Sequence, residues 1–278
     1  MQQEEQQNKE DKEELVKEEV VQDAQEEGRY IYCVVEKGNT SEFQEKGIEN
    51  NSVYLLCDGD LCAVVHTCPA KPYVSPHKEQ VIDWVKAHQK VIDQAYAVFG
   101  TVIPFSFDVI IKGSKGKHSE QLVKEWLRSK EEELKKKIER IKGKQEFGVK
   151  IFLHEQEVMK AIMQSNKEIQ NLEDKIKIAK KGVAYFHKQK IQAIIKKEIE
   201  KYAELYFKEF YKKIKQAAEE VRVEKAKKQD TFIMVLNASV LVKKEHVSAL
   251  GDMLDYIHKK QGFSVEFTGP WPPYSFTS

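Results

Sequence analysis

Arginine is scarce in this 278-residue chain, where it supplies four of the 46 basic residues and lysine supplies the rest. Because the planar guanidinium suits bidentate contacts to phosphate and guanine, this scarcity argues against a nucleic-acid-binding protein. No apolar run approaches the roughly 20 residues that span a bilayer, and the polar, acidic N-terminal sequence is unlike a secretory signal. We therefore expect neither nucleic acid nor a membrane among the partners, and we expect a cytoplasmic location.

The sequence also lacks the glycine patterns of phosphate-binding and nucleophilic enzymes. It contains no G-x-G-x-x-G, no G-x-x-x-x-G-K-[ST] and no G-x-S-x-G. Residues 113–117 (GSKGK) have the composition of a phosphate loop without its spacing. We expect no cofactor.

The net charge of +1 conceals an uneven distribution of charge along the chain. Residues 1–27 contain 11 acids and three lysines, whereas residues 160–228 contain 19 bases and ten acids. Low hydrophobicity with an excess of one charge is typical of disorder, so we predict a disordered acidic tail over residues 1–28. The lysines of residues 160–228 are interpreted as a solvated helix face.

Residues 29–112 predict an N-terminal domain of mixed strands with one main helix. RYIYCVV, from residue 29, is aromatic and β-branched, and VYLLC and LCAVVH flank a turn at residues 58–60, which predicts a β-hairpin. Apolar residues then recur every three or four positions between residues 81 and 99, which predicts a helix. TVIPFSFDVII follows as an extended segment, and residues 113–116 are interpreted as a linker.

Residues 119–278 predict a second domain. A helix that starts at Ser119, as its N-cap, runs up to Gly143 and is followed by the strand EFGVKIFL. Residues from about 155 to 228 have no proline and one glycine, Gly182, and two helical stripes flank that glycine, which predicts a long helical arm. A strand, a helix over 245–260 and the strand FSVEF complete an order that suits a ferredoxin-like domain with a helical insertion. The predicted fold class is therefore α+β in two domains.

Three of the four cysteines lie close to His66 in the sequence. Cys57-x4-Cys62-x3-His66-x-Cys68 offers thiolate and imidazole ligands for zinc, but the spacing differs from the paired C-x-x-C motifs of structural zinc sites. Free cysteine is also a common core residue. We expect no metal and, for a cytoplasmic protein, four reduced thiols.

His88 falls on the apolar stripe of its predicted helix, which leaves two interpretations open. The first is a buried, hydrogen-bonded histidine. The alternative is an enzyme of unrecognised type in which His88 acts with a nearby carboxylate such as Glu79 or Asp83. These acids are four residues apart and share a helix face, but His88 lies five residues beyond Asp83 and fits that face poorly.

Two aromatic features are candidates for partner binding. The long helical stripe carries Tyr202, Tyr206 and Phe210, and its own domain or another protein must cover this face. Near the C-terminus, three prolines resist helix formation and predict a rigid extended tail that presents Trp271 and Tyr274. This tail is either a docking surface or a lock that packs back onto its domain.

The terminal string FTGPWPPYSF, residues 267–276, resembles the closing signature of the gas vesicle accessory proteins of the F and L type. Further segments resemble that family in the same order: YIYCVV from residue 30, LCAVV from 61, TVIPFSF from 101, KQEFGVKI from 144 and NASVLV from 237. The resemblance covers about residues 29–278, and TVIPFSF and LNASVLV lean towards the F type. The chain departs from the family at Asp108, where glycine is frequent, and in its cysteines.

The resemblance implies a non-enzymatic accessory or minor structural protein of gas vesicles, which are hollow protein shells inside microbial cells. It implies binding to the small hydrophobic major shell protein, and to other accessory proteins, during nucleation or assembly of the shell. It also implies two α+β domains, the second related to the ferredoxin-like arrangement. The family motif positions are His88, Pro104, Phe107, Glu146, Lys150, Gly269, Pro270, Trp271, Pro272, Pro273 and Tyr274.

Overall fold

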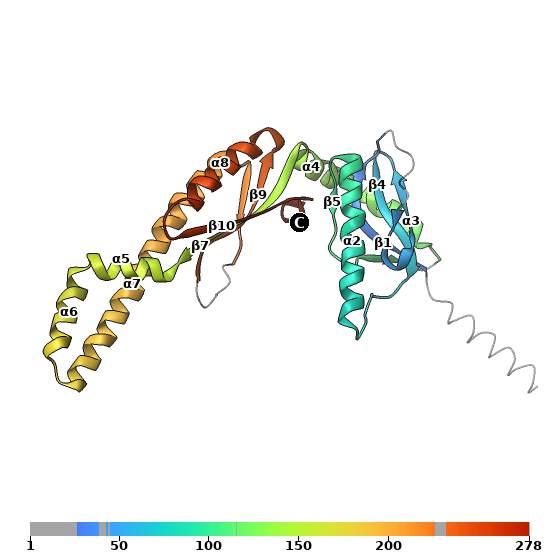
Figure 1. The fold of residues 1–278 in the computed structure, drawn as a ribbon. Helices are drawn as coiled ribbons and strands as arrows, with labels where there is room; N and C mark the ends of the chain where they lie inside the picture. The colour runs from blue at the N-terminus through green and yellow to red at the C-terminus, as the bar shows by residue number, and fades with distance from the viewer. Residues whose placement is uncertain (1–26, 39–42, 44, 115, 226–231, 278) are drawn as a thin grey trace, which may run out of the picture. The chain divides into compact units, whose positions relative to one another are not determined.

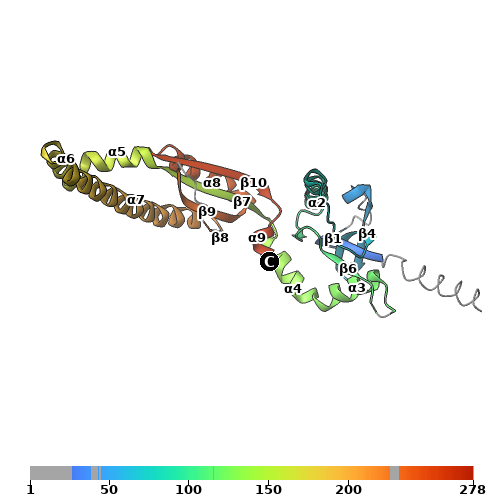
Figure 2. The ribbon, with the colours of Figure 1, turned by 90° about the horizontal axis from the view of Figure 1, so that it is seen from below.

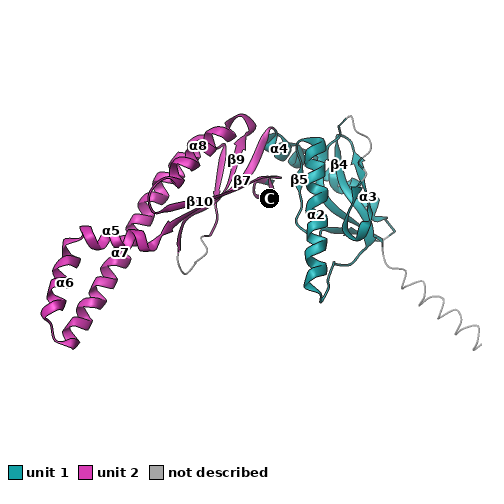
Figure 3. Cartoon of the chain, viewed as in Figure 1, with its two compact units in different colours: residues 1–142, 277 teal, residues 143–276, 278 magenta. Residues whose placement is uncertain are grey.

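The computed structural model describes residues 27–38, 43, 45–114, 116–225 and 232–277. The predicted tail over residues 1–28 therefore lies outside the described residues up to residue 26, and Glu27 already begins the first strand. The described residues form two compact units, one up to Lys142 and one from Gly143 to Phe276 (Figures 1 and 3). The α+β class with two units is as predicted.

The boundary between the units lies after Lys142 and not in the predicted linker at residues 113–116. The helix predicted to start at Ser119 and open the second domain is two helices, α3 (Ser119–Ser129) and α4 (Glu131–Ile141), and both belong to the first unit. They stay there because α3 buries Val123 and Leu127 against the first sheet. The domain ranges 29–112 and 119–278 are corrected accordingly.

The first unit is an antiparallel sheet with helices on both faces. The helix predicted over residues 81–99 is α2 (Lys78–Phe99), which packs on one face, while α3 packs on the other (Figure 2). Strand β1 is consequently buried on both faces. The sheet order is β2-β3-β4-β1-β5, with β6 also paired to β1. The strands are β1 (Glu27–Glu36), β2 (Glu45–Lys46), β3 (Ser52–Asp58), β4 (Leu61–Pro69), β5 (Ile103–Pro104) and β6 (Ile110–Lys112).

The second unit has the predicted ferredoxin-like arrangement. Its strands are β7 (Lys144–His154), β8 (Glu220–Val223), β9 (Phe232–Lys243) and β10 (Phe263–Trp271). The first connection contains α5 (Glu155–Ser165), α6 (Lys167–Ile178) and α7 (Lys181–Ala217), and the last contains α8 (Val247–His258). All pairings in the order β10-β7-β9-β8 are antiparallel, so the last strand lies beside the first in a β–α–β–β–α–β succession.

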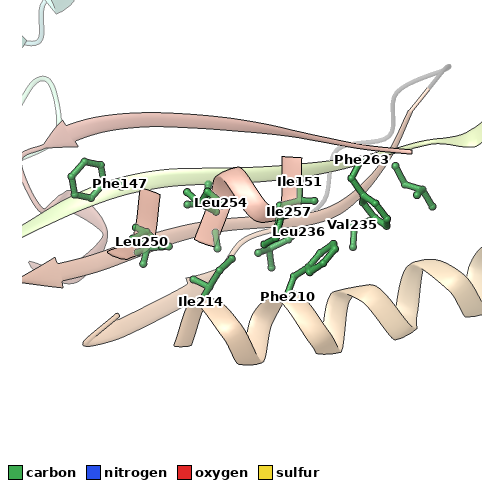
Figure 4. Close-up of a cluster of buried hydrophobic side chains, with 14 of the residues drawn as sticks. Phe147, Ile151, Phe210, Ile214, Val235, Leu236, Leu250, Leu254, Ile257 and Phe263 are labelled. Atoms are coloured by element: carbon green, nitrogen blue, oxygen red, sulfur yellow. The ribbon is translucent and has the colours of Figure 1, made fainter. Parts of the chain in front are cut away.

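Helices α7 and α8 cover one face of this sheet and form the core of the unit (Figure 4). Phe210 and Ile214 of α7 and Leu254 of α8 contribute fully or almost fully buried side chains. Alternate residues of β7, such as Phe147 and Ile151, point into the same cluster, as the two-residue period of a strand requires.

The helical insertion forms the predicted arm, but its end differs from the prediction. The arm has its own small apolar cluster of Ile169, Leu172 and Ile191. It was predicted to continue to about residue 228, whereas α7 ends at Ala217 and β8 follows. Val221 falls within the stretch predicted to be helical, but it lies in this four-residue strand because β8 pairs with β9.

Candidate partner-binding surfaces

A tyrosine–histidine pair is buried between the first sheet and α2. The hydroxyl of Tyr30 lies 2.9 Å from His88 Nδ1, and His88 Nε2 lies 3.1 Å from the carbonyl oxygen of Phe105. Because a carbonyl oxygen only accepts, Nε2 of the neutral imidazole donates and Nδ1 accepts from Tyr30. The Tyr30 hydroxyl in turn accepts the Asp108 N–H at 3.0 Å, so every polar group in this chain of hydrogen bonds has a partner.

A second pair lies beside the first. His66 Nδ1 is 2.8 Å from the Tyr32 hydroxyl, and His66 Nε2 is 2.9 Å from the Tyr73 hydroxyl. Burial lowers the pKa of both His66 and His88 to about 4, because desolvation penalises the imidazolium form. Both imidazoles are therefore neutral at pH 7.

The structure does not bring His88 and the carboxylates of the enzyme alternative together. Glu79 and Asp83 are exposed on α2, whereas His88 is buried and hydrogen bonded at both ring nitrogens. Phe107 packs edge-on against the His88 ring, with ring centroids 5.9 Å apart, and Pro104 is buried in β5. These three motif positions thus belong to the core of the first unit.

Asp108 accounts for one departure from the family pattern. It has a positive φ of 73°, a conformation that glycine adopts without strain and aspartate tolerates better than most residues. Its Oδ1 also accepts the N–H of Tyr73 at 3.1 Å, which holds the loop between β4 and α2. The carboxylate therefore has a local structural role.

Cys57 and Cys62 form a disulfide, so the prediction of four reduced thiols was wrong. The two residues are direct partners across the β3–β4 ladder, with Cα atoms 4.0 Å apart. The prediction relied on the reducing environment expected of a cytoplasmic protein. The register of the β3–β4 hairpin, which the prediction did not consider, brings the two sulfur atoms together. Cys33 and Cys68 are buried free thiols, and burial raises the pKa of Cys68 to about 11. Within the described part of the chain, no group of three His, Cys, Asp or Glu residues could hold a metal ion.

The aromatic face of α7 is covered by its own unit. Phe210 is fully buried and therefore is a core residue, which corrects its assignment as a partner contact. Tyr202 and Tyr206 are half-buried, with their ring centroids 6.3 Å and 4.8 Å from that of Phe263 in β10. The Lys260 ammonium lies 4.8 Å from the centre of the Tyr206 ring. Little of this face is left for a partner.

Strand β10 is irregular near its end, where its register with β7 shifts between Thr268 and Trp271. Gly269 has a φ of 119°, and the Gly269–Pro270 peptide bond is cis. A Cβ atom at Gly269 would lie 2.9 Å from the carbonyl oxygen of Glu146 and 3.0 Å from the Phe147 ring, so glycine is required here. Trp271 rejoins the ladder opposite Glu146. The predicted extended tail thus ends as a strand, and a short helix, α9 (Tyr274–Thr277), follows it.

Glu146 holds the returning segment in place. Its Oε2 accepts the N–H of Ser275 at 2.9 Å, and its Oε1 accepts the Ser275 hydroxyl at 2.6 Å. Burial raises the pKa of Glu146, and these hydrogen bonds oppose the shift. Phe276 is fully buried, with the Arg222 guanidinium 5.6 Å from its ring centre. Of the two interpretations of the tail, this geometry is that of a lock.

The other motif positions near the lock divide between interior and surface. Pro272 and Pro273 are buried and Tyr274 is half-buried, so these residues contribute to the lock more than to a docking surface. Lys150 is half-buried, and its side chain pairs with Glu266 at 3.1 Å across the β7–β10 ladder. Exposed ion pairs of this kind contribute little to stability.

Strand β10 is an edge of the second sheet and carries two exposed aromatic residues, Phe267 and Trp271, which we call the edge aromatic pair. Their exposed fractions are 41% and 46%. The Phe267 ring stacks on Phe147 at 4.9 Å, and Trp271 Nε1 donates to Thr268 Oγ1 at 3.3 Å. Both aromatic side chains are therefore held in place while one side of each faces solvent.

The backbone of β10 alternates between β7 and the outer edge. The Gly262 carbonyl accepts the N–H of His154 at 2.8 Å on the β7 side, whereas the Val265 N–H points outwards and donates to His258 Nδ1 at 3.3 Å. The same alternation directs the N–H and C=O of Phe267 to the outer edge. Among the described strands, β7 alone pairs with β10, so this edge can accept an added strand.

A third exposed surface, missed in the sequence, is the turn between α6 and α7. Ile178, Val183, Tyr185 and Phe186 are 52–88% exposed, and we call residues 175–190 the arm tip. The sequence around these apolar residues is rich in lysine, so this stretch was interpreted as a solvated helix face. The signal that could have identified the surface is a set of apolar residues in the helical pattern that no second helix covers.

None of the described helices is long and apolar enough to cross a membrane. This statement covers the residues that the structure describes and agrees with the lack of a long apolar run in the full sequence.

Residues 28–278 match the family model described as gas vesicle synthesis protein GvpL/GvpF. Gas vesicle protein L1 of Halobacterium salinarum is 28% identical over 264 residues, which cover 90% of each chain. Gas vesicle protein F of Nostoc is 21% identical, over 90% of this chain and 97% of the relative. These identities are higher for the L relative, so they do not reinforce the slight leaning of two segments towards the F type.

The fold is also similar to two crystal structures. GvpF of Anabaena superposes with a TM-score of 0.72 at 22% identity, over 90% of this chain and 98% of that one. GvpF of Microcystis aeruginosa gives a TM-score of 0.64 at 19% identity, over 90% and 99% of the two chains. At these identities the superpositions show a shared fold.

The buried histidines predict a pH dependence of stability. Between about pH 6.5 and pH 4, the unfolded chain protonates at His66 and His88 while the folded chain does not. The free energy of unfolding should therefore fall as the pH is lowered through this window, by up to about 1.4 kcal/mol per pH unit for each histidine. Urea titrations followed by circular dichroism at pH 7, 6 and 5 measure the slope.

His88→Gln should reduce this slope, because the buried titrating group is gone. His77→Gln, at an exposed histidine next to α2, is the matched control and should keep the wild-type slope. An unchanged slope in His88→Gln would show that folding does not lower the pKa of His88.

The lock predicts unequal effects of two aromatic substitutions in one segment. Phe276→Ala removes a fully buried ring and should lower the free energy of unfolding by about 3–5 kcal/mol. Trp271→Ala, at a half-exposed position, should cost about 1 kcal/mol or less. Urea unfolding at pH 7 tests both, and equal small losses would mean that the C-terminal segment is not docked in solution.

Proposed function

The chain belongs to the GvpL/GvpF family of gas vesicle synthesis proteins, and we propose that it is a non-enzymatic accessory protein that binds the small hydrophobic major shell protein and assists nucleation or assembly of the vesicle. A shell subunit with an apolar surface would aggregate unless another protein covered it before assembly. The proposed site of action is the cytoplasm and the growing gas vesicle.

The observation that carries this proposal is the edge aromatic pair on β10. Phe267, in register with Val149, and Trp271, in register with Glu146, offer apolar surface on opposite faces of β10, and the outward backbone of the strand between them offers hydrogen bonds. A hydrophobic shell subunit with an exposed strand needs both, since its backbone polar groups must be paired when its apolar side chains are covered. Of the contacts predicted from the sequence, Trp271 is the one that we retain.

The lock supports the same surface. Trp271 pairs with Glu146 in the ladder, and the hydrogen bonds between Glu146 and Ser275 fix the segment that follows it, so the aromatic side chain is presented in one position. A preorganised side chain loses less conformational entropy on binding than a mobile one.

The test is binding of the purified major shell protein, solubilised and labelled, to the full chain. Trp271→Ser with Phe267→Lys should weaken binding by tenfold or more, because central aromatic contacts contribute about 2 kcal/mol each and an edge lysine disfavours strand addition. Val98→Ser, at an equally exposed apolar residue of the first unit, is the matched control and should bind as the wild type. Circular dichroism confirms folding, and unchanged affinity of the double variant would overturn the proposed surface.

A further inference from the structure

The arm tip lies away from the sheet that forms the core of its unit (Figure 1). Phe210 of α7 is buried in that core, whereas Lys181, where the helix begins, lies about 44 Å away along the helix. The tip nevertheless exposes four apolar side chains by 52–88%: Ile178, Val183, Tyr185 and Phe186. Because the folding of the arm leaves these side chains in water, they favour contact with a partner.

The charge of the tip is of one sign. From residue 175 to residue 197 the sequence has eight lysines and no aspartate or glutamate. Lys177 pairs with Asp174 at 2.8 Å and Lys190 with Glu168 at 2.9 Å, and both acids precede this stretch. The other exposed lysines of the tip have no ion pair with a described residue: Lys175, Lys180, Lys181 and Lys188. The surface therefore favours an acidic partner, and the tip of a second copy, which carries the same lysines, is repelled.

The tip also has a groove that suits a helix. Helices α6 and α7 pack on each other, and a groove of about 550 Å³ between them is lined by Glu173, Ile176, Lys177, Lys188, Ile191 and Gln192. Two packed helices leave a groove along which a third helix can lie, as in a helical bundle. Its two isoleucines accept aliphatic side chains at helical spacing, and its two lysines favour carboxylates beside them.

These features fit a polypeptide better than a membrane or a nucleic acid. A lipid surface has no side chain to insert into the groove between α6 and α7. Residues 175–197 contain no arginine, which disfavours a nucleic acid. An acidic helix satisfies the apolar groove and the lysines together.

We propose that the arm tip is the docking site for an acidic amphipathic helix of another protein. The aliphatic face of that helix fills the groove between α6 and α7 and covers Ile178 and Phe186, while its carboxylates pair with the tip lysines. The site lies wholly within the second unit and is separate from the β10 edge that we propose for the shell protein. The chain thus has a second binding site, for a partner of different chemistry.

The probe is a labelled synthetic peptide with leucine and glutamate arranged at helical spacing, and fluorescence anisotropy measures its binding to the full chain. Its affinity should fall at least about fivefold between about 50 mM and 500 mM salt, because exposed charges are screened. A peptide with the same residues in scrambled order, and one with glutamine in place of glutamate, should each bind at least about tenfold more weakly. Equal affinities of the three peptides, or no binding of the first, would overturn the proposal.

Charge reversal locates the site. Lys180→Glu with Lys181→Glu should weaken binding of the leucine–glutamate peptide at least about tenfold. Lys212→Glu with Lys215→Glu, at exposed lysines near the other end of α7, is the matched control and should bind as the wild type. In the wild type, a zero-length carbodiimide should join the glutamates of the peptide to the tip lysines in preference to Lys212 and Lys215. Equal losses in the two variants, or cross-links without preference, would contradict a site at the tip.

The apolar part of the site has its own variants. Ile178→Ser with Phe186→Ser should also weaken binding at least about tenfold, since exposed apolar anchors lose their burial. Leu205→Ser, at a residue of α7 that is 60% exposed and lies outside the tip, should keep the wild-type affinity. Circular dichroism confirms that each variant is folded. If vesicles of phosphatidylserine and phosphatidylcholine bind through Ile178 and Phe186 and the acidic peptide does not, the partner is a membrane and the proposal is wrong.

Discussion

The buried carboxylate of Glu146 determines where the C-terminal end of the second unit packs. Glu146 lies on β7, beside residues that point into the core, and its own side chain points to the opposite face of the sheet. A buried carboxylate is costly unless donors satisfy it, and Ser275 supplies two of them from the end of the chain. The position of the C-terminal segment therefore depends on a polar requirement as well as on the burial of Phe276.

This constraint also explains why Trp271 is left exposed. At Gly269 the strand approaches the Glu146 backbone closely, and Trp271 rejoins the ladder opposite Glu146 at the sheet edge. The residues that follow Trp271 then form the lock, in which Ser275 reaches the Glu146 carboxylate. The edge aromatic pair is thus a consequence of how the lock is closed, and the same hydrogen bonds that stabilise the unit orient its exposed surface.

The sequence predicted those elements whose signal is local. Helix α2 has a regular apolar period, the β3–β4 hairpin has a strong turn, and the ferredoxin-like order follows from alternating strand and helix patterns. Strand β8 was missed because four residues give little periodicity and its partner β9 lies beyond it in the sequence. The domain boundary was misplaced because a glycine-rich turn looks like a linker until α3 is seen to pack on the first sheet.

For the candidate surfaces too, the sequence predicted the local pattern but not the long-range packing. Aromatic residues at helical spacing identified the face with Tyr206 and Phe210, but the ring that covers it, Phe263, lies far along the chain, so exposure was not predictable. Conversely, lysines concealed the apolar arm tip, because a high local charge is usually a sign of a solvated face. Burial is a property of long-range packing, and the local pattern shows only that an apolar face exists.

The two exposed surfaces, the β10 edge and the arm tip, differ in chemistry, so a single partner is not suited to both. The β10 edge offers aromatic rings and backbone hydrogen bonds, which suit an apolar partner with a free strand. The arm tip offers apolar groups within a field of lysines, and an uncharged apolar partner would leave those lysines desolvated without compensation. A partner for the tip must therefore bring carboxylates, so the two surfaces are suited to different partners.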